Sequence, residues 1–485
     1  MATVTVVGAG VGGLSAAARL AAAGHRVTVF EQAATVGGKL GRYERETAAG
    51  TFRFDTGPSL FTLPQVAAEL FASTGGGGLD LVPLDPIVRH RFPDGSTLDS
   101  TGGDAFAERI AAAFGADAAA DWRRLWRRAG RVWAASWRHV LTSPAGPLRM
   151  AGLAWRLGDL AAIAPGRTLR GLGRTHLRDP RLRMLLERYA TYTGADPRRA
   201  PAALLAIPYA ELAFGGWYLR GGLGTLADAL LERCESLGVR VHTGTAVRSI
   251  AVAGSRAAGV VLDDGAEVAA DVVVANADAL HVYRDLLPSP RPRPRPARRL
   301  AARSLGGFVL LLGVRGRTPG LAHHTVFFPR DYDAEFDAVF GSPPAPVADP
   351  AVFVTVADDP LVRPDGCEAW FVLVNAAPQG PVDWRSAGPG HADRVLEVLA
   401  ERGFDVRDRL LFRHVLTPAD LEAATRSPGG AIYGTASHGL AGMLRPPNRA
   451  PVPGLFLVGG SVHPGGGLPL VMLSAKIVAD LIGAG

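Results

Sequence analysis

A glycine-rich segment near the C-terminal end has the composition of a site for an electron-rich ligand. Residues 458–469, VGGSVHPGGGLP, hold five glycines and two prolines between a strand-like run at 453–457 and a run with helical spacing at 470–478. A strand that turns into a helix through bare backbone presents unshielded N–H groups and the positive end of the helix dipole. We therefore expect a cofactor here, against Gly460, Gly466, Gly467 and Leu468.

A second glycine segment, GAGVGG, runs from residue 8 to residue 13. A β-branched strand is predicted before it at 3–7, an alanine-rich helix after it to residue 23, and a second strand at 26–30. This order of strand, turn and helix is the context that a dinucleotide-binding motif requires.

The residues of that motif have separate physical tasks. Gly8 allows the tight turn, Gly10 lets the backbone approach a pyrophosphate, and Gly13 lets the helix pack closely on the strand. Gly12 belongs to the same bare turn, and Glu31 ends the second strand where a ribose hydroxyl would be bound. A carboxylate there disfavours a 2′-phosphorylated nucleotide.

The chain after the second strand indicates which dinucleotide is bound. Residues 36–42, VGGKLGR, and 52–59, FRFDTGPS, look like the second glycine turn and the loop that wrap an extended FAD. Lys39 and Arg42 are candidate pyrophosphate partners, although Arg42 is equally an ordinary solvated cation. The predicted cofactor residues of these two segments are Gly38, Lys39, Arg42, Gly57, Pro58 and Ser59.

Short strands separated by tight turns follow much later, at 239–242, 246–253, 259–262 and 268–275. They look like a second portion of an FAD domain that returns to the first sheet, with backbone near Val247 meeting the adenine. Strand-like runs at 308–312, 352–356 and 370–374 would form the sheet of a second domain, after a stiff proline-rich linker at 288–296.

We therefore predict an α/β fold with a discontinuous, Rossmann-like FAD-binding domain of the glutathione-reductase type, a β-sheet substrate domain and a helical region that is a candidate for membrane association. The predicted bounds are 1–75, 225–287 and 441–485 for the FAD domain, 76–105, 201–224 and 288–440 for the substrate domain, and 106–200 for the helical region.

Composition fits a globular protein in a reducing compartment. The chain has 485 residues, of which 48% are hydrophobic and 20% charged. We expect no signal peptide, because the first strand begins almost at Met1, and no membrane span, because no run of 18 apolar residues occurs. Two isolated cysteines, Cys234 and Cys367, suggest neither a disulfide framework nor a metal site.

The net charge of +7 comes almost entirely from arginine. Residues 121–139, DWRRLWRRAGRVWAASWRH, form a helical pattern with tryptophans on one face and arginines on the other. Such a helix either lies in a membrane interface or packs its tryptophans into the protein's own core. A second amphipathic stretch at 148–172 adds to the first alternative. Nucleic-acid binding is disfavoured, since no aromatic and basic module of known pattern is present.

Five segments carry a resemblance to a known family. They are GAGVGGLSAAARLAAAG from Gly8, VGGKLGRYE from Val36, FDTGPSLFTLP from Phe54, the run from Arg188 to Leu230, and GLFLVGGSVHPGGGLPLVMLSAK from Gly454. The chain resembles the bacterial-type phytoene desaturase family of FAD-dependent carotenoid desaturases over nearly its whole length. ATYTGADPRRAPA together with GGSVHPGGGLP is most similar to the branch that desaturates hydroxylated carotenoids at C3 and C4.

The resemblance implies an FAD-dependent oxidoreductase that dehydrogenates a CH2–CH2 unit next to a polyene, with hydride passing to flavin N5. The preferred reaction is 3,4-desaturation of an acyclic or hydroxylated carotenoid. Multi-step phytoene desaturation, a related flavin-dependent polyene isomerase or amine oxidase, and a pigment-binding protein with a vestigial FAD fold remain alternatives. The intact glycines argue against the last of these.

The resemblance also implies site residues and partners. Leu60, Trp217, Tyr218 and Pro469 would border the substrate tunnel, and His463 would assist proton transfer. The alternatives are that the aromatic residues pack a domain interface and that His463 only hydrogen-bonds backbone. The implied partners are a polyene, a membrane surface and an electron acceptor such as quinone or oxygen, and the implied location is the cytoplasm, at the periphery of the cytoplasmic membrane.

Overall fold

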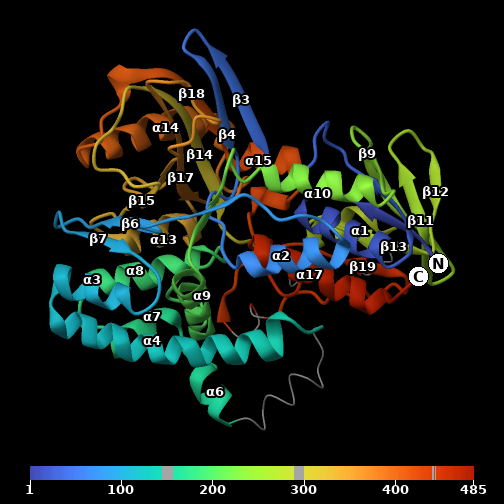
Figure 1. Cartoon of the computed structure of the whole chain (residues 1–485), viewed down its shortest axis with the longest axis horizontal. Coiled ribbons are helices and arrows are strands. Elements are labelled where there is room, and N and C mark those ends of the chain that lie inside the picture. The colour runs from blue at the N-terminus through green and yellow to red at the C-terminus, as the bar shows by residue number, and fades with distance from the viewer. Residues whose placement is uncertain (145–156, 289–299, 440–441, 443) are drawn as a thin grey trace.

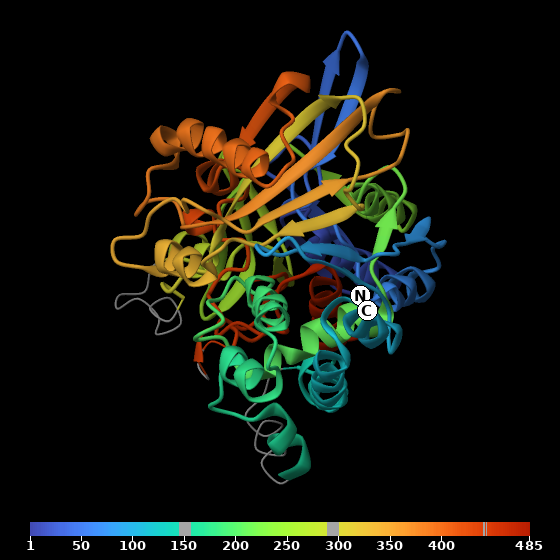
Figure 2. The same cartoon turned by 90° about the vertical axis from the view of Figure 1, so that its left-hand side faces the viewer.

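The computed structural model describes residues 1–144, 157–288, 300–439, 442 and 444–485. It consists of a parallel sheet with covering helices, a larger mixed sheet, and a helical region beneath the mixed sheet in Figure 1. Within the described residues, no helix is both long enough and apolar enough to cross a membrane. The two chain ends lie side by side, as Figures 1 and 2 both show.

The parallel sheet joins segments that are far apart in the sequence. Its order is β19-β13-β1-β2-β9. The strands are β1 (Thr3–Val7), β2 (Arg26–Phe30), β9 (Arg240–His242), β13 (Val272–Ala275) and β19 (Leu455–Leu457). The strands predicted at 3–7 and 26–30 are confirmed. The strand predicted at 268–275 is two strands, because Asp271 interrupts it and accepts hydrogen bonds from the backbone N–H and the hydroxyl of Thr3 at 2.8 and 2.7 Å.

Burial is nearly continuous along β1, β13 and β19, because both faces of the sheet are covered. Val4 and Val6 point to one face, where four helices pack: α1 (Val11–Ala22), α2 (Pro64–Thr74), α10 (Thr225–Ser236) and α17 (Leu468–Ile482). Val7 and Val273 point to the other face, which is covered by the antiparallel strands β10 (Val247–Ala253), β11 (Arg256–Leu262) and β12 (Glu267–Ala269).

The mixed sheet has seven strands in the order β18-β14-β17-β16-β15-β6-β7. They are β6 (Val88–Arg91), β7 (Thr97–Ser100), β14 (Gly306–Arg315), β15 (His324–Phe327), β16 (Val352–Val356), β17 (Cys367–Ala376) and β18 (Leu410–Leu416). Trp384 and Val395 of helix α14 (Trp384–Glu401) pack on one face with Phe308. Figure 2 shows this sheet lying above the helical region.

Smaller elements connect these layers. They are β3 (Arg42–Thr47), β4 (Gly50–Asp55), β5 (Leu81–Pro83), β8 (Trp217–Leu219), α11 (Ala279–His281), η3 (Val282–Leu286), α13 (Tyr332–Phe340), η4 (Arg407–Arg409), α15 (Pro418–Thr425) and η5 (Pro428–Gly430). The helix start predicted at Thr417 is confirmed, with a reciprocal capping box between Thr417 and Asp420.

The helical region contains α3 (Ala105–Phe114), α4 (Ala116–Ser136), the π-turn η1 (Trp137–Leu141), α6 (Leu157–Ile163), α7 (Leu169–His176), α8 (Pro180–Thr191), η2 (Ala202–Leu205) and α9 (Ala206–Phe214). Part of the amphipathic stretch predicted at 148–172, and the linker predicted at 288–296 beyond Pro288, lie outside the described residues.

The tryptophans of α4 and η1 contact other parts of the protein. Trp122 is buried, whereas Trp126, at 4.6 Å from the ring of Tyr209, and Trp133, at 5.4 Å from the ring of Phe214, are half-buried. These contacts favour the alternative in which the indoles pack on the protein itself, and a membrane role for this helix stays a prediction. Tyr209 and Phe214 belong to α9, so a helical projection of residues 121–139 alone cannot show that they lie against these indoles.

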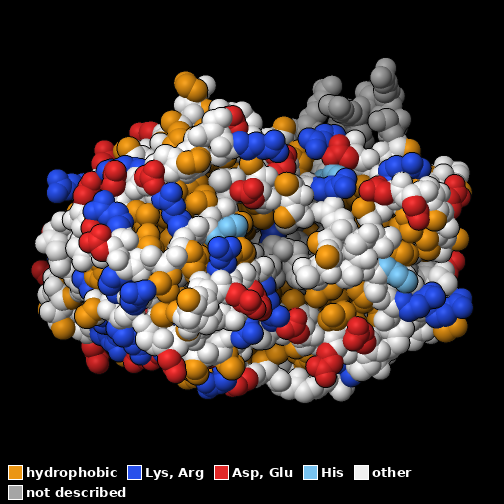
Figure 3. Space-filling model, turned by 90° about the horizontal axis from the view of Figure 1, so that it is seen from above, with side chains coloured by type: hydrophobic (Ala, Val, Ile, Leu, Met, Phe, Trp, Pro, Cys, Tyr) orange, Lys and Arg blue, Asp and Glu red, His pale blue; other side chains and the backbone are white. Residues whose placement is uncertain are grey.

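The surface charges are mixed on the face opposite α4. Figure 3 shows Lys and Arg side chains interspersed with Asp and Glu there. Ion pairs account for much of this pattern, including Arg53 with Glu44 at 3.0 Å and Arg394 with Glu401 at 2.9 Å. This face is therefore not the continuous basic surface that a nucleic acid would require.

Candidate functional site

The turn between β1 and α1 is bare because other parts of the chain lie against it. A Cβ atom on Gly13 would come within 2.0 Å of the Gly8 carbonyl oxygen, and one on Gly12 within 2.7 Å of the side-chain amide of Asn276. Gly8 has a φ of +95°, which residues with a side chain rarely adopt. Asn276, which follows β13, was not predicted, because its contact with the turn depends on how distant strands pair.

Glu31 connects this turn with the start of β10. Its Oε2 accepts a hydrogen bond from the Ala9 N–H at 2.7 Å, and its backbone carbonyl accepts one from the Thr245 N–H at 2.7 Å. Carboxylate oxygens have further lone pairs for a hydroxyl donor. The roles proposed for Glu31 at a ribose and for the backbone near Val247 at an adenine are compatible with this arrangement.

The second glycine turn touches the first. The Gly37 N–H donates to the Ala9 carbonyl at 2.9 Å, and a Cβ atom on Gly38 would lie 3.2 Å from Gly10 Cα. A Cβ atom on Gly57 would lie 1.9 Å from the Lys39 carbonyl oxygen. Three segments that the sequence assigned to one cofactor therefore meet in space.

Arg42 points elsewhere. Its Nη2 lies 2.6 Å from Asp228 Oδ2 on α10, and its side chain is 39% exposed. This exposed ion pair fits the alternative in which Arg42 is a solvated surface cation, and its role at the pyrophosphate stays a prediction.

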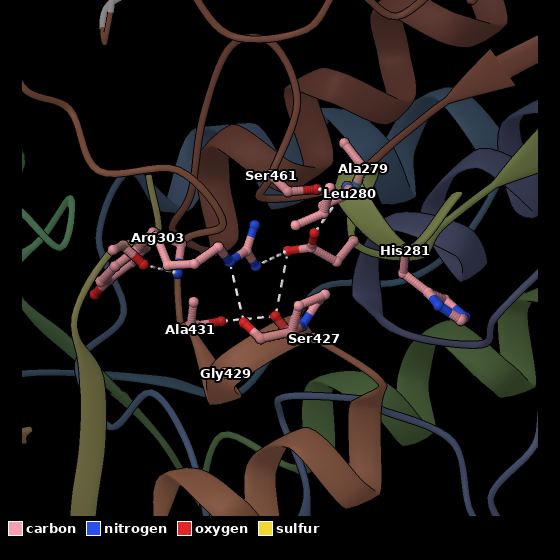
Figure 4. Close-up of polar contacts among 12 residues, drawn as sticks. Ala279, Leu280, His281, Arg303, Ser427, Gly429, Ala431 and Ser461 are labelled. Atoms are coloured by element: carbon pink, nitrogen blue, oxygen red, sulfur yellow. Dashed lines mark hydrogen bonds and ion pairs between the residues drawn. The ribbon is translucent and has the colours of Figure 1, made fainter. Parts of the chain in front are cut away.

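Three cations converge near the second glycine turn. Arg303 Nη2 donates to Asp278 Oδ2 at 2.7 Å, and Ser427 Oγ donates to the same oxygen at 3.2 Å. Lys39 Nζ donates to the Ala431 carbonyl at 2.9 Å, and Arg445 Nη1 donates to the Tyr433 carbonyl at 2.6 Å. Figure 4 shows Arg303, Ser427 and Ala431 within this cluster.

Positive charge exceeds negative charge in this cluster. The charges of Lys39, Arg303 and Arg445 act on one another, and Asp278 is the carboxylate that acts on both Lys39 and Arg445. Burial lowers the pKa of Lys39 to about 8 and that of Arg445 to about 10. Such a cluster fits an anionic ligand, so the glycine cradle and the cations together suit the diphosphate and the electron-rich ring of FAD.

The C-terminal glycine segment forms the start of α17, as predicted. Gly467 precedes the helix with a φ of +101°, and a Cβ atom on Gly466 would come within 2.5 Å of Tyr433 Cδ1. A Cβ atom on Gly460 would lie 3.3 Å from Gly466 Cα. The positive end of the α17 dipole therefore faces the space that Gly465, Gly467 and Leu468 line.

His463 makes a structural contact. One ring nitrogen, Nε2, lies 2.8 Å from the Ser143 carbonyl oxygen, which can only accept a hydrogen bond, so Nε2 carries the proton. Burial lowers the pKa of His463, so the ring is neutral. This geometry fits the alternative in which His463 hydrogen-bonds backbone, and it leaves Nε2 unable to act as a base.

A cavity of about 1090 Å³ lies against these loops. Helices α4 and α9 contribute Trp133, Ile207 and Ala210 to its lining, and the mixed sheet contributes Phe353 and Leu373. The predicted site residues among the lining are Gly57, Pro58, Ser59, Leu60, His463, Gly466, Gly467, Leu468 and Pro469. Its volume is slightly above the usual range for ligand pockets, about 300–1,000 Å³.

Trp217 and Tyr218 do not line this cavity as it is described. Trp217 Nε1 donates to the Phe214 carbonyl at 2.9 Å, and Tyr218 Oη donates to Asp359 Oδ2 at 2.8 Å. Both belong to β8, which pairs with β5. The alternative that these aromatic residues pack between parts of the fold therefore fits better than a role in the substrate tunnel.

Polar side chains that the prediction missed lie in the cavity wall. Arg188 of α8, Glu211 of α9 and Tyr332 of α13 are all buried and all line the cavity. The sequence held one signal that Arg188 is buried: it follows Leu185 by three positions, which places it next to the apolar stripe of its helix. Glu211 and Tyr332 gave no such signal.

Known relatives match the chain over nearly its full length. A 1-hydroxycarotenoid 3,4-desaturase from Flavobacterium sp. (strain P99-3) is 32% identical, with 98% of each chain covered. A hydroxyneurosporene desaturase from Rubrivivax gelatinosus is 35% identical, covering 99% of this chain and 93% of that protein. A 4,4'-diapolycopene oxygenase from Methylomonas sp. is 32% identical, with 99% of this chain and 98% of that protein covered.

Solved structures match the fold. An oxidoreductase from Methanosarcina mazei superposes with a TM-score of 0.66 at 17% identity, covering 99% of this chain and 100% of that one. A triple mutant of putrescine oxidase also superposes with a TM-score of 0.66 at 17% identity, covering 99% and 98%. At this identity the likeness concerns the fold.

The family description "flavin containing amine oxidoreductase" matches residues 11–319. This range includes α1, the second glycine turn, and Asp278 and Arg303 of the cation cluster. The chain therefore belongs to the flavin-containing amine oxidoreductase family, is an FAD-dependent oxidoreductase, and groups within that family with the carotenoid desaturases.

Proposed function

We propose that the protein is a carotenoid desaturase that removes two hydrogens from a CH2–CH2 unit beside a polyene, with 3,4-desaturation of an acyclic, hydroxylated carotenoid as its reaction. The main support is the cavity of about 1090 Å³ between the cofactor loops and the mixed sheet, whose lining is mostly apolar. The names of the two desaturase relatives support the choice of substrate.

The residues of the three glycine segments would hold the cofactor. The bare turn at Gly8 to Gly13 and the N-terminus of α17 present backbone N–H groups, and Lys39 and Arg445 add positive charge nearby. When bound, oxidised FAD supplies the hydride acceptor.

The cavity would orient the substrate and exclude water. Leu60 and Pro469 come from opposite ends of the chain and both line it, next to cofactor segments. Loss of a hydride leaves positive charge that a polyene delocalises, and this makes the neighbouring C–H acidic. A strong protein base is therefore not required, which agrees with the protonated Nε2 of His463.

Product analysis tests this proposal. The FAD-loaded protein is incubated in liposomes with a 1-hydroxylated acyclic carotenoid, with the same chain lacking the hydroxyl, or with phytoene, and a quinone or oxygen is supplied as acceptor. We expect a product lighter by two hydrogens from the hydroxylated carotenoid. Unchanged substrates in every arm would overturn the proposal, and turnover of phytoene alone would favour the multi-step alternative.

A second candidate is oxygenation of the polyene end, which the similarity to the diapolycopene oxygenase favours. The same experiment under labelled oxygen separates the two reactions. An oxygenase yields a product that carries the label, whereas a desaturase yields an unlabelled product with one more double bond.

We also propose that the protein docks on a membrane surface through α4 and the adjoining cavity rim. Arg123, Arg127 and Arg131 are exposed along one side of α4. Leu444 is 63% exposed and also lines the cavity, which indicates that the cavity opens near an exposed apolar residue. Because the indoles pack inward, the arginines and this rim carry the membrane proposal.

Charge reversal tests the membrane proposal. Changing Arg123, Arg127 and Arg131 to Glu should weaken flotation with anionic vesicles on the order of 100-fold, because each cation near such a surface contributes about 1 kcal/mol. The same reversal at Arg45, Arg248 and Arg385, which are exposed elsewhere, is the control. Equal flotation of the two triple variants would contradict docking through α4.

A further inference from the structure

Arg188 is a buried cation with unused hydrogen-bonding capacity. It is 5% exposed and lines the cavity. Its Nη1 donates to Tyr192 Oη at 2.8 Å, and its Nη2 lies 3.9 Å from Glu211 Oε1. Within the part of the chain that the structure describes, Nε and Nη2 of Arg188 have no hydrogen-bond partner. An unpaired buried donor costs free energy, so a ligand that accepts from it is favoured.

A second unpaired donor lies in the same wall. Tyr332 is buried and lines the cavity, and its hydroxyl has no hydrogen-bond partner among the described residues. Burial raises the pKa of this hydroxyl well above its ordinary value, so the group stays protonated and acts as a donor. Tyr332 lies close enough to Arg188 for the guanidinium charge to act on that pKa.

Glu211 supplies the matching acceptor. Its Oε1 accepts from Tyr189 Oη at 2.7 Å, and its Oε2 accepts from Tyr192 Oη at 3.1 Å. Each carboxylate oxygen can accept a further hydrogen bond. Glu211 also lines the cavity, so donors and an acceptor belong to the same cavity wall.

The charge of the cluster selects the type of ligand. Arg188 and Glu211 form a pair without net charge, so a carboxylate or an amine would enter with an uncompensated charge. Unpaired donors next to an acceptor complement a neutral hydroxyl, which both accepts and donates. Neighbouring lining residues such as Ile207, Leu305 and Phe353 are apolar and fit a hydrocarbon chain.

We propose that Arg188, Glu211 and Tyr332 form a hydroxyl-binding subsite in the cavity, which makes the protein prefer polyenes with a hydroxyl group on an otherwise hydrocarbon end. This proposal rests on the proposed function and adds the residues that determine its specificity. A site built to hydrogen-bond a hydroxyl discriminates strongly against the analogue that lacks it, because its polar groups are then left unpaired.

The test measures kcat/KM for a hydroxylated acyclic carotenoid and for the identical chain without the hydroxyl, and expresses them as a ratio. Arg188→Met should lower this ratio at least 10-fold, and Tyr332→Phe about 10-fold, because each removes a donor to the hydroxyl. Arg188→Lys keeps the charge and should retain part of the preference.

The control is Arg19→Met. Arg19 is also buried and paired with a carboxylate, since its Nη1 donates to Glu69 Oε1 of α2 at 3.2 Å, but it does not line the cavity as described. This variant should lower stability and leave the ratio unchanged. If Arg188→Met does not fold, Tyr332→Phe still tests the subsite, since it removes one hydroxyl and no charge.

Equilibrium binding separates failure of the subsite from failure of the proposed function. The absorption shift of each polyene on binding gives a dissociation constant whether or not turnover occurs. If wild type turns over neither polyene yet binds the hydroxylated one at least 10-fold more tightly, and Tyr332→Phe reduces this, the subsite stands while the desaturase proposal fails. A ratio and a relative affinity that no variant changes would overturn the subsite, leaving these groups to bind only water.

Discussion

At the residue scale, Lys39, Arg303 and Arg445 lie around Asp278 where the cofactor segments meet, and positive charge is in excess there. Arg188 instead has Glu211 at 3.9 Å, so that pair carries no net charge. The first cluster suits an anionic cofactor and the second a neutral substrate group.

Lys39 should affect the reduction potential of the bound flavin. Lys39→Met removes a positive charge from the cofactor cluster and should lower the two-electron midpoint potential by about 30 mV, equivalent to about 1.4 kcal/mol. The measurement is equilibration with a dye of known potential. Lys476→Met is the matched control, because Lys476 is the other lysine of the chain and pairs with Asp480 on the surface of α17. Equal potentials in the two variants would exclude Lys39 from the flavin environment.

Glu335 should make stability depend on pH. Burial raises its pKa to about 7 from an ordinary 4.5, while Asn375 Nδ2 and the Ala351 N–H each donate to its carboxylate at 2.6 Å. The folded protein therefore retains this proton up to about pH 7, whereas the unfolded chain releases it near pH 4.5. The contribution to stability thus falls as pH rises through this window, by roughly 3 kcal/mol in total.

The variant Glu335→Gln has no carboxyl group to ionise at this position, so its stability should not fall as pH rises through this window. Urea unfolding at several pH values between 5 and 7.5 should give a flatter stability curve for this variant than for wild type. Glu397→Gln, at a side chain that is 52% exposed, is the control and should follow wild type. Parallel curves for Glu335→Gln and wild type would show that Glu335 titrates normally.

At the element scale, the cofactor site depends on turns that touch. The turn before α1 contacts the second glycine turn through Gly37 and Ala9, and the backbone of Gly57 crosses Lys39. A Cβ atom on Gly57 would lie 1.9 Å from the Lys39 carbonyl oxygen, and one on Gly13 would lie 2.0 Å from the Gly8 carbonyl oxygen of its own turn. Gly57 is therefore required by packing between segments and Gly13 by packing within its turn, while the turn conformation itself requires a glycine at Gly8.

Gly13→Ala should disrupt this turn. The added methyl group would collide with the Gly8 carbonyl, so we expect a loss of about 3 kcal/mol in stability and loss of FAD retention on gel filtration. Gly390→Ala is the control, since a Cβ atom there meets open space within α14. That variant should gain roughly 0.5–1 kcal/mol. Retention of FAD by Gly13→Ala would contradict the assigned cradle.

At the scale of the whole molecule, the cavity is enclosed by several layers of the fold, and no single segment of the chain forms it. The mixed sheet, the helical region and the cofactor loops each contribute lining residues, such as Leu373, Trp133 and Gly467. The lining residues of the cofactor loops come from near the start of the chain, such as Gly57 and Leu60, and from near its end, such as Gly467. Ligand binding should therefore stabilise the molecule as a unit.

Removal of FAD should lower the thermal stability of the whole chain. Saturation at 100 times the dissociation constant stabilises a folded protein by about 2.7 kcal/mol, so we expect a single unfolding transition that shifts upward with FAD concentration. FMN, which lacks the adenylate, should shift Tm less because it leaves the turn at Gly8–Gly13 and Glu31 unoccupied. Equal shifts with FMN and FAD, or none with either, would contradict binding of the dinucleotide across the three segments.

The turns proposed to hold the cofactor were predictable from the sequence as structural elements, because their determinants are local. Glycine spacing, β-branched runs and the acidic residue after the second strand are constraints within a few residues of one another. The strands at 3–7 and 26–30 and the helix start at Thr417 followed from such patterns, and all were confirmed. What lies opposite a side chain is not contained in such patterns: Arg42 pairs with Asp228, and Trp217 Nε1 donates to the Phe214 carbonyl.

The sequence by itself determined the fold class, the dinucleotide-binding turns and the family, since these depend on short-range sterics and on runs of matching residues. Only the tertiary structure decided which groups face one another: Lys39 and Arg445 near Asp278, the tryptophans of α4 against Tyr209 and Phe214, and Arg188 beside Glu211. The physical reason is that burial and charge balance depend on non-local packing, which no local pattern encodes.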